Sequence, residues 1–213
     1  MGTKGERRKK KLPGKTVERL SEYRRTLISR LAEGKEYVFS HELADLHNNT
    51  AVQVRRDIML IGYSGVQRRG YKVKELIQAI GKVLDDPQGQ NVAIVGVGHL
   101  GTAILHYLKD KRPSLFLKAL FDVDEQKTGR ELNGIPCYHI DDLESVVREK
   151  NIEIAILTVP VEVALETTVL LVQAGIRGLM NFTTIPLDVP EGVCLEEYDL
   201  ITSLEKVAYF VRT

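Results

Sequence analysis

The first part of the chain carries apolar residues at the three- and four-residue spacing of amphipathic helices. Between Thr16 and Gly34 the apolar positions are Val17, Leu20, Tyr23, Leu27 and Leu31. One face of a helix would hold all five, and Gly34 is a typical helix stop. The pattern therefore predicts a first helix from Thr16 to about Gly34.

Three more helices are predicted before Pro87. The second spans residues 40–46 with Ser40 as its N-cap, and the third runs from Thr50 to about Ile61. Thr50 and Gln53 have the spacing of a capping box at the start of the third helix. The fourth covers residues 74–85. Two helices joined by a tight polar turn are typical of a helix-turn-helix, and the glycine-rich segment 62–73 suits the hairpin of a winged helix.

Beyond Pro87 the period of the apolar positions changes. Strand-like runs at 91–95, 115–121, 152–159 and 178–182 alternate with helical stretches near 99–109, 141–149 and 162–174. Continuous apolar strands interleaved with helices predict a parallel, doubly wound sheet that is covered on both faces.

The chain ends in an amphipathic helix whose apolar stripe includes Leu200, Leu204, Val207 and Val211. Such a stripe needs a partner, which is either the domain's own sheet or a second subunit. The expected fold class is thus α/β, in four parts. These are a basic disordered arm at 1–13, a winged helix-turn-helix domain at 14–86, a Rossmann-type domain at 87–198 and a C-terminal dimerisation helix at 199–213.

Charge divides at the same boundary. The formal net charge of the 213 residues is +1, but residues 1–87 carry 19 basic and 11 acidic side chains, whereas residues 88–213 carry 11 and 18. A cationic helix-turn-helix favours DNA, because neutralising phosphates releases counterions. The two halves therefore suggest two tasks, and the near-neutral sum is their cancellation.

The turn after the first strand of the second domain has the sequence GVGHLG, with Gly96, Gly98 and Gly101 at dinucleotide-binding spacing. The next strand ends at Asp122, where a carboxylate would accept from ribose hydroxyls and repel a 2′-phosphate, so NAD(H) is favoured over NADP(H). The predicted cofactor-binding residues are Gly96, Val97, Gly98, His99, Leu100 and Gly101 in the turn, Asp122 and Val123 after it, and the strand ends Thr158, Val159, Pro160, Asn181, Phe182 and Thr183.

No catalytic residue is predicted. A dehydrogenase needs a substrate domain and a proton donor or acceptor beside the nicotinamide, and only about 30 residues follow the last predicted strand. Cys137 and Cys194 lie in apolar segments without metal-ligand spacing, so we expect buried thiols and no metal. No stretch approaches 18 uninterrupted apolar residues, so we expect a cytoplasmic protein without a membrane span. A nucleotide- or CoA-binding subunit of a metabolic enzyme and a nucleoid-type protein without sequence preference remain alternatives.

Over residues 14–213 the sequence resembles the redox-sensing transcriptional repressor Rex family of bacteria. The shared motifs are VQVRRDI (52–58), GVGHLG (96–101), FDVDEQKTGRELNGIPCYHIDDL (121–143), LTVP (157–160) and QAGIRGLMNF (173–182). The resemblance implies a homodimer that binds a palindromic double-stranded operator when NADH is low and leaves it when NADH accumulates. NADH and NAD⁺ would be the sensed ligands, and respiratory or fermentative genes the targets.

The resemblance also assigns roles to residues. Gln53, Arg55 and Arg56 match the recognition helix, and the predicted DNA-contacting set is Ser40, Thr50, Gln53, Arg55, Arg56, Arg68, Arg69 and Tyr71. Asp57 is expected to order the arginines. The wing departs from the family pattern, since Val66-Gln67 stand where relatives carry a Lys-Arg pair.

A polar linkage that responds to the bound cofactor is expected from Arg25, Tyr107 and Asp199. The terminal helix would insert into the other subunit, and Leu200 stands where relatives carry an aromatic residue.

Overall fold

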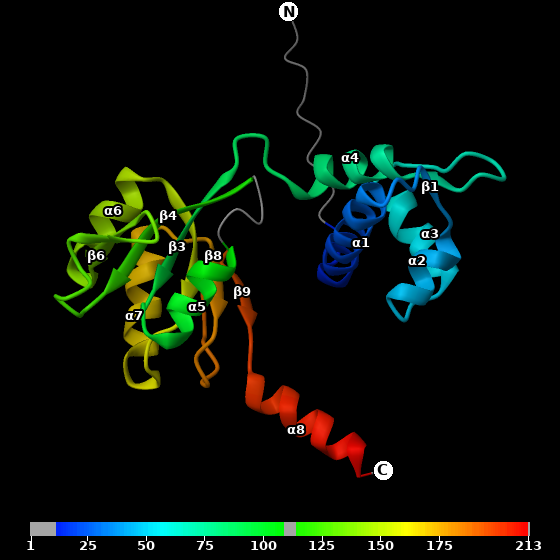
Figure 1. Ribbon diagram of the computed structural model, residues 1–213. Helices are drawn as coiled ribbons and strands as arrows, with labels where there is room; N and C mark the ends of the chain where they lie inside the picture. Colours follow the sequence, from blue (N-terminus) through cyan, green and yellow to red (C-terminus); the bar gives the residue numbers. More distant parts are fainter. Residues whose placement is uncertain (1–11, 109–113, 213) are drawn as a thin grey trace, which may run out of the picture. The chain divides into compact units, whose positions relative to one another are not determined.

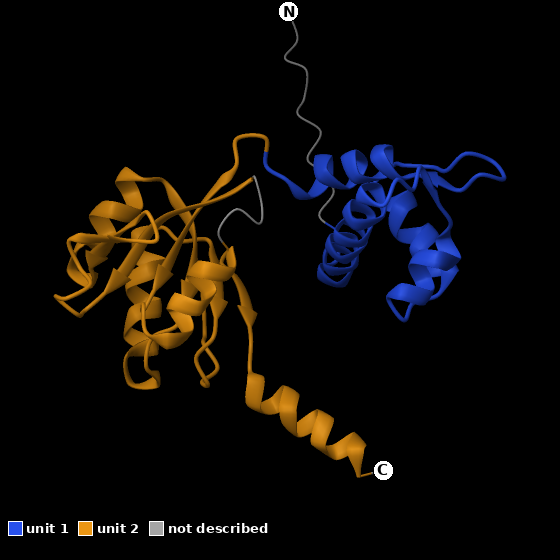
Figure 2. Cartoon of the chain, in the orientation of Figure 1, with its two compact units in different colours: residues 1–86 blue, residues 87–213 orange. Residues whose placement is uncertain are grey.

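The computed structural model describes residues 12–108 and 114–212 and divides the chain into two compact units, residues 1–86 and 87–213 (Figure 2). Most of the predicted basic arm, residues 1–11, lies outside the described residues.

The first unit is a small helical domain with one two-stranded sheet (Figure 1). Its elements are α1 (Gly14–Ala32), β1 (Tyr37–Val38), α2 (Ser40–Leu46), α3 (Ala51–Leu60), β2 (Tyr71–Lys72) and α4 (Val73–Leu84). Side chains from all four helices form its core, including Leu20, Leu27, Leu43, Ile58 and Leu76. This core fixes α3 against α1 and α2, because the apolar stripe of each helix is buried against the others.

One local prediction for this unit is wrong. Ser40 is the first helical residue of α2 and not its N-cap, and the Glu42 carboxylate instead accepts a hydrogen bond from the backbone amide of Phe39 at 2.6 Å. Strand β2, at the end of the predicted hairpin 62–73, pairs antiparallel with β1, a two-residue strand that the sequence did not predict. The wing itself is a tight turn closed by a bridge between Val66 and Gly70.

The second unit is a seven-stranded sheet with the order β5-β6-β4-β3-β7-β8-β9. All neighbouring strands are parallel except β5 and β6. The strands are β3 (Gln90–Val95), β4 (Leu115–Asp122), β5 (Arg130–Leu132), β6 (Ile135–His139), β7 (Ile152–Leu157), β8 (Gly178–Asn181) and β9 (Cys194–Glu197). The helices are α5 (His99–Leu108), the 3-10 helix η1 (Ile140–Asp142), α6 (Leu143–Glu149), α7 (Val161–Ala174) and α8 (Leu200–Val211).

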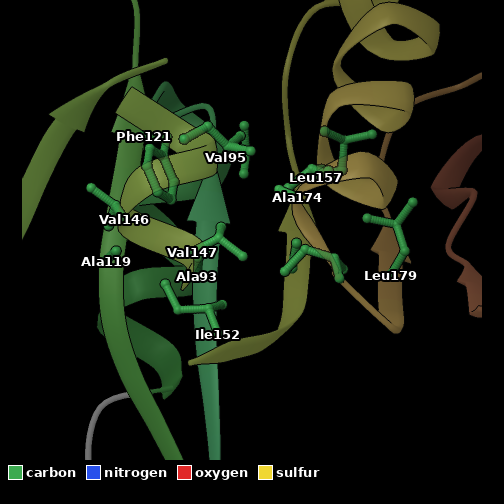
Figure 3. Close-up of a cluster of buried hydrophobic side chains, with 14 of the residues drawn as sticks. Ala93, Val95, Ala119, Phe121, Val146, Val147, Ile152, Leu157, Ala174 and Leu179 are labelled. Carbon is green, nitrogen blue, oxygen red and sulfur yellow. The ribbon is translucent and has the colours of Figure 1, made fainter. Parts of the chain in front are cut away.

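Alternate residues of the central strands are buried on opposite faces of this sheet. Ala93 and Val95 belong to a core cluster with residues of α6 and α7 (Figure 3), whereas Val92 and Ile94 belong to a second cluster with Leu105 of α5. Because strand order reverses at β3, a crevice is expected at the carboxyl ends of β3 and β7. The α/β fold class with a parallel Rossmann-type sheet is confirmed.

Two further differences from the sequence predictions concern β7 and the cysteines. Strand β7 ends at Leu157, two residues earlier than expected, so Thr158 lies in the loop beyond it. Cys137 is buried as predicted, but Cys194 is exposed on β9, because this strand lies at the edge of the sheet.

Candidate functional site

The glycine-rich turn joins β3 to α5, and its three glycines have different roles. A Cβ atom on Gly96, which has φ of 90°, would lie 2.8 Å from the carbonyl oxygen of Thr158. A Cβ atom on Gly101 would lie 2.0 Å from the carbonyl oxygen of Gly96. A Cβ atom on Gly98 would have no neighbour within 4 Å among the described residues. The chain itself thus requires glycine at 96 and 101, whereas Gly98 leaves space that a ligand could occupy.

Thr158 holds this turn from the end of β7. Its hydroxyl donates to the carbonyl oxygen of Gly96 at 2.6 Å, and its amide donates to Val95 at 2.9 Å. The hydroxyl is therefore directed at the turn, and a contact of Thr158 with the nicotinamide stays a prediction.

Asp122 closes the turn from the end of β4. Its Oδ2 accepts from the amide of Val97 at 2.7 Å and from Lys127 Nζ at 3.2 Å, while Oδ1 accepts from the amide of Asp124 at 3.0 Å. Burial alone would raise the pKa of this carboxyl, but the two amides and the Lys127 ammonium outweigh it, and the pKa lies below its usual value. Asp122 is thus held as an anion beside the turn. Its Oδ1 has two lone pairs and accepts one of these bonds, so an additional donor such as a ribose hydroxyl could still bind there.

Lys127 was not predicted as part of this site. The feature of the sequence that indicates this contact is the position of Lys127, five residues after Asp122 in a turn that folds back on the end of β4.

The predicted cofactor contacts at 181–183 make hydrogen bonds and a ring contact close to the strand end, and their contact with a cofactor stays a prediction. Asn181 is buried and donates to the carbonyl oxygen of Ile185 at 2.9 Å, while its Oδ1 accepts from both the amide and the hydroxyl of Thr183. Phe182 stacks on Tyr198 at 4.9 Å between ring centroids. The polar groups of Asn181 and Thr183 form hydrogen bonds within this loop, whereas the Phe182 ring is only partly buried.

The other predicted residues of this site lie on its rim. His99, Leu100, Val123 and Pro160 are exposed, and Val159 is partly buried against the core. The first turn of an α-helix leaves amide hydrogens without intrahelical partners, so the start of α5 at His99 can attract an anion. The exposed residues of the rim surround the glycine-rich turn and the Asp122 carboxylate, and this is the arrangement expected of a dinucleotide site.

The recognition-helix candidates of the first unit lie on α3 and the wing. Arg55 and Arg56 are exposed, and Arg55 Nη1 donates to the hydroxyl of Ser40 at 3.1 Å. Thr50 is the N-cap of α3, and its hydroxyl accepts from the amide of Gln53 at 3.1 Å. Exposed arginines on the second helix of a helix-turn-helix are suitably placed for DNA.

The wing contributes Arg68 and Arg69, both exposed in the tight turn, where Arg68 has φ of 63°. Tyr71 differs from its prediction as a DNA contact. Only 8% of it is exposed, and its ring packs in the core, because β2 turns it inward toward Tyr63.

Asp57 of α3 is the centre of a buried polar network. Arg19 of α1 donates to both carboxylate oxygens, from Nε at 2.7 Å and from Nη2 at 2.8 Å. The Tyr23 hydroxyl donates at 3.2 Å and Gln53 Nε2 donates at 2.9 Å. Burial raises the pKa of Tyr23 far above its usual value, and the neighbouring Asp57 charge adds to the shift.

This network corrects two predictions. Gln53 completes no capping box, because its side-chain amide donates to Asp57 and does not bond to the backbone of Thr50. The arginine that Asp57 orders is Arg19, and not the pair on its own helix. The sequence signal for Asp57 is its place in the buried stripe of α3, where an acidic side chain needs a cationic partner.

Of the three residues of the predicted switch, Arg25 belongs to the first unit, and Tyr107 and Asp199 belong to the second. Arg25 is exposed on α1, Tyr107 is exposed on α5 and Asp199 is the N-cap of α8. Hydrogen bonds from the Thr202 hydroxyl and the amides of Thr202 and Ile201 lower the pKa of Asp199. The linkage of Arg25, Tyr107 and Asp199 stays a prediction.

Among the described residues no group of three or more His, Cys, Asp or Glu side chains could hold a metal ion. In the same part of the chain, no helix is both long and apolar enough to cross a membrane.

A helix-turn-helix unit followed by a parallel-sheet unit with a glycine-rich turn defines the class of two-domain transcriptional regulators that carry a nucleotide-binding domain. Residues 88–185 match the family model described as "CoA binding domain", and residues 11–58 match "Putative DNA-binding protein N-terminus". The chain is 39% identical to the redox-sensing transcriptional repressor Rex of Listeria monocytogenes serovar 1/2a, over 95% of this chain and 94% of that one. Its identity to Rex of Bacillus subtilis (strain 168) is also 39%, over 95% and 93%. The chain therefore belongs to the Rex family of redox-sensing transcriptional repressors.

Solved structures agree with this assignment. RSP in complex with β-NAD⁺ and operator DNA superposes with a TM-score of 0.87 at 32% identity, covering 95% of this chain and 93% of that chain. RSP in complex with β-NADH gives a TM-score of 0.83 at 31% identity, covering 95% of both chains. RSP is a Rex-family repressor. The family prediction is confirmed, and the relatives are named as repressors and not as enzymes, in line with the absence of a predicted catalytic residue.

Proposed function

We propose that this protein is a cytoplasmic homodimer that represses respiratory or fermentative genes by binding a palindromic operator when NADH is low. NADH binding releases it from DNA. The proposal is carried by the superposition of this chain on RSP in complex with β-NAD⁺ and operator DNA. The same chain has exposed Arg55 and Arg56 on α3, and a glycine-rich turn in which Gly98 faces open space.

The residues of the second unit fit a dinucleotide. The open space at Gly98 lets the backbone approach a pyrophosphate, and the start of α5 supplies amide hydrogens. The Asp122 carboxylate lies beside the same turn through its bond to Val97, where it accepts ribose hydroxyls and repels a 2′-phosphate. NAD(H) is therefore preferred over NADP(H).

Discrimination between the two redox states follows from charge. The reduced nicotinamide ring is neutral and the oxidised ring is cationic. Val159, Pro160 and Phe182 offer mostly apolar surface at the strand ends, and Leu200 of α8 adds to it if the terminal helix inserts into the other subunit. Burying a cation against apolar side chains is costly, so the pocket favours NADH.

A twofold dimer explains the form of the operator. Two symmetric copies of α3 would enter successive major grooves, so the DNA site mirrors the protein symmetry. If NADH stabilises a dimer whose two α3 helices no longer match the half-site spacing, DNA must weaken NADH binding by the same factor as NADH weakens DNA binding.

This reciprocity is the test. NADH is titrated into the full-length protein, followed by NADH fluorescence, with and without an operator duplex selected from a random-sequence library, at fixed salt. We expect the duplex to weaken NADH binding and NADH to release the duplex by equal factors. An NADH affinity that is unchanged by the duplex contradicts the proposal.

The match to a CoA-binding model favours one other candidate, a CoA-binding subunit of an enzyme. CoA in the same titration distinguishes the two functions. Release of the duplex by NADH and not by CoA supports the repressor, whereas tight CoA binding without any sequence-selected duplex supports the enzyme subunit.

A further inference from the structure

The outward face of α3 is not only cationic. Val52 and Met59 are 65% and 71% exposed on this helix, on either side of Arg55 and Arg56. Together with Leu60, these four side chains line a shallow hollow of about 440 Å³. Residues spaced by three, four and seven positions share one helix face, so the apolar and cationic groups form a single surface.

Gln53 lies outside this surface. Its amide donates to Asp57 at 2.9 Å, and Asp57 is fully buried against Arg19 and Tyr23. An adenine contact by Gln53 would require this bond to break. The exposed side chains of this surface that can contact a partner are therefore those of Arg55 and Arg56 and the apolar ones of Val52 and Met59.

The mixture of apolar and cationic groups indicates the partner. A second copy of the chain placed symmetrically on this face would bring Arg55 and Arg56 against themselves, which is electrostatically unfavourable. The major groove of DNA offers the opposite, phosphates for the arginines and the C5-methyl group of thymine as its apolar feature. Charge complementarity thus favours DNA as the occupant.

We propose that Val52 and Met59 are specificity-determining residues that read thymine methyl groups in the operator. The proposal rests on the proposed function and deepens it. Seven helical residues span about 10 Å, and base pairs are stacked about 3.4 Å apart. A helix lying along the groove would thus place the two side chains about three base-pair steps apart.

The experiment removes methyl groups from the DNA. An operator duplex is first selected from a random library by the full-length protein. Each thymine of a half-site, with its symmetry mate, is then replaced by deoxyuracil, which lacks only the C5-methyl group, and affinity is measured by fluorescence anisotropy at fixed salt. We expect one or two positions, a few base pairs apart, at which the loss is about three- to fivefold per methyl group, as for one buried methylene.

Protein variants connect these positions to the side chains. Val52→Ala should weaken binding to the thymine operator and abolish the effect of deoxyuracil at one position, and Met59→Ala should do so at another. Ile28→Ala, a comparable truncation of an exposed aliphatic residue on α1, is the control and should leave every deoxyuracil effect unchanged.

The outcomes separate this proposal from the proposed function. If the library yields no preferred duplex, the repressor function itself fails. If a preferred duplex binds but no deoxyuracil substitution weakens it, or if both variants remain as sensitive to deoxyuracil as the wild type, methyl reading is overturned while sequence-specific binding stands.

Discussion

Arg19 of α1 and Asp57 of α3 form a two-point ion pair, with N···O distances of 2.7 and 2.8 Å, around a carboxylate that is fully buried. The same carboxylate accepts from Tyr23 and Gln53. The recognition helix is thereby fixed to the first helix of its domain by a satisfied polar network, and not by apolar packing alone.

Arg19→Met should destabilise the DNA-binding unit, because it leaves the buried Asp57 carboxylate without its cation. Removing one partner of a buried ion pair costs about 3–5 kcal/mol, and the partial exposure of Arg19 favours the lower end. Urea unfolding of the full-length protein, followed by circular dichroism, measures the loss.

The matched control is Arg30→Met, which breaks an exposed pair with Glu33 and should change stability far less than Arg19→Met, because solvent screens that pair. The double variant Arg19→Met with Asp57→Leu should recover much of the loss, since no buried charge remains. An equal effect of Arg19→Met and Arg30→Met would show that the network contributes no more than a surface pair.

The sequence predicted the elements that depend on local pattern. Continuous apolar runs identified β3, β4, β7 and β8, because strands buried on both faces need such runs. The glycine-rich turn was also predicted from the sequence, because backbone atoms within 3 Å leave no space for a Cβ atom at positions 96 and 101.

What the sequence did not predict depends on contacts distant along the chain. The strands β5, β6 and β9 have only three, five and four residues, too few for a clear pattern, and each lies toward an edge of the sheet, where it pairs with a neighbouring strand. The pairing of Arg19 with Asp57 spans 38 residues, and the structural use of Asn181 depends on a loop that folds back at Ile185. Neither periodicity nor composition records such pairs.

Gly98→Ala should separate ligand binding from folding. The added methyl group meets no described atom within 4 Å and the backbone there has an ordinary φ, so the variant should be as stable as the wild type. It should weaken NADH binding at least tenfold, because the methyl group occupies the space proposed for the pyrophosphate. Thermal unfolding and an NADH fluorescence titration give the two readouts.

Gly101→Ala is the contrasting variant at the same turn. Its methyl group would lie 2.0 Å from the Gly96 carbonyl oxygen, so the loss should be in stability, by about 1–3 kcal/mol. If Gly98→Ala lost stability instead and bound NADH normally, the turn would have no ligand to accommodate at that position.

Asp122→Asn should lower stability in a pH-dependent manner. The folded-state pKa of Asp122 lies below its ordinary value of 3.8, so the anionic form contributes stability above that value and loses it as pH falls through the folded-state pKa. The difference in unfolding free energy between wild type and variant should therefore be full near pH 7 and shrink below about pH 4.

Urea titrations over this pH range test the sign, and Asp124→Asn, at a more exposed carboxylate, is the control. A difference that grows on acidification would show that Asp122 is strained and not stabilised by its donors. Asp122→Ala should weaken NADH binding more than it alters operator binding, the latter measured in cofactor-free protein.

The two thiols should react differently. Burial is the main cause that raises the pKa of Cys137 to about 11, whereas Cys194 is exposed on the edge strand β9. A thiol-specific reagent at pH 8 should therefore label one cysteine in the native protein and two in urea. Cys194→Ser should abolish native labelling, and Cys137→Ser should leave it unchanged. Native labelling that persists in Cys194→Ser would place Cys137 within reach of solvent.

The terminal helix should decide the oligomeric state. Leu200, Leu204, Val207 and Val211 are all more than half exposed on α8, so this stripe does not dock on the sheet of its own unit. We expect Leu204→Glu combined with Val207→Glu to convert a homodimer into monomers, because a paired interface would have to bury two carboxylates. Sedimentation velocity at micromolar concentration measures the change.

Lys206→Glu on the same helix is the control, since it alters charge outside the apolar stripe and should leave a dimer. The monomeric variant should still fold, because the stripe belongs to neither unit's core, but it should lack the stabilisation that dimer formation adds. It should lose tight binding to a palindromic duplex while retaining weak binding to a half-site. A double variant that still sediments as a dimer would show that other surfaces join the subunits. The role of α8 would then be limited to placing Leu200 and Asp199.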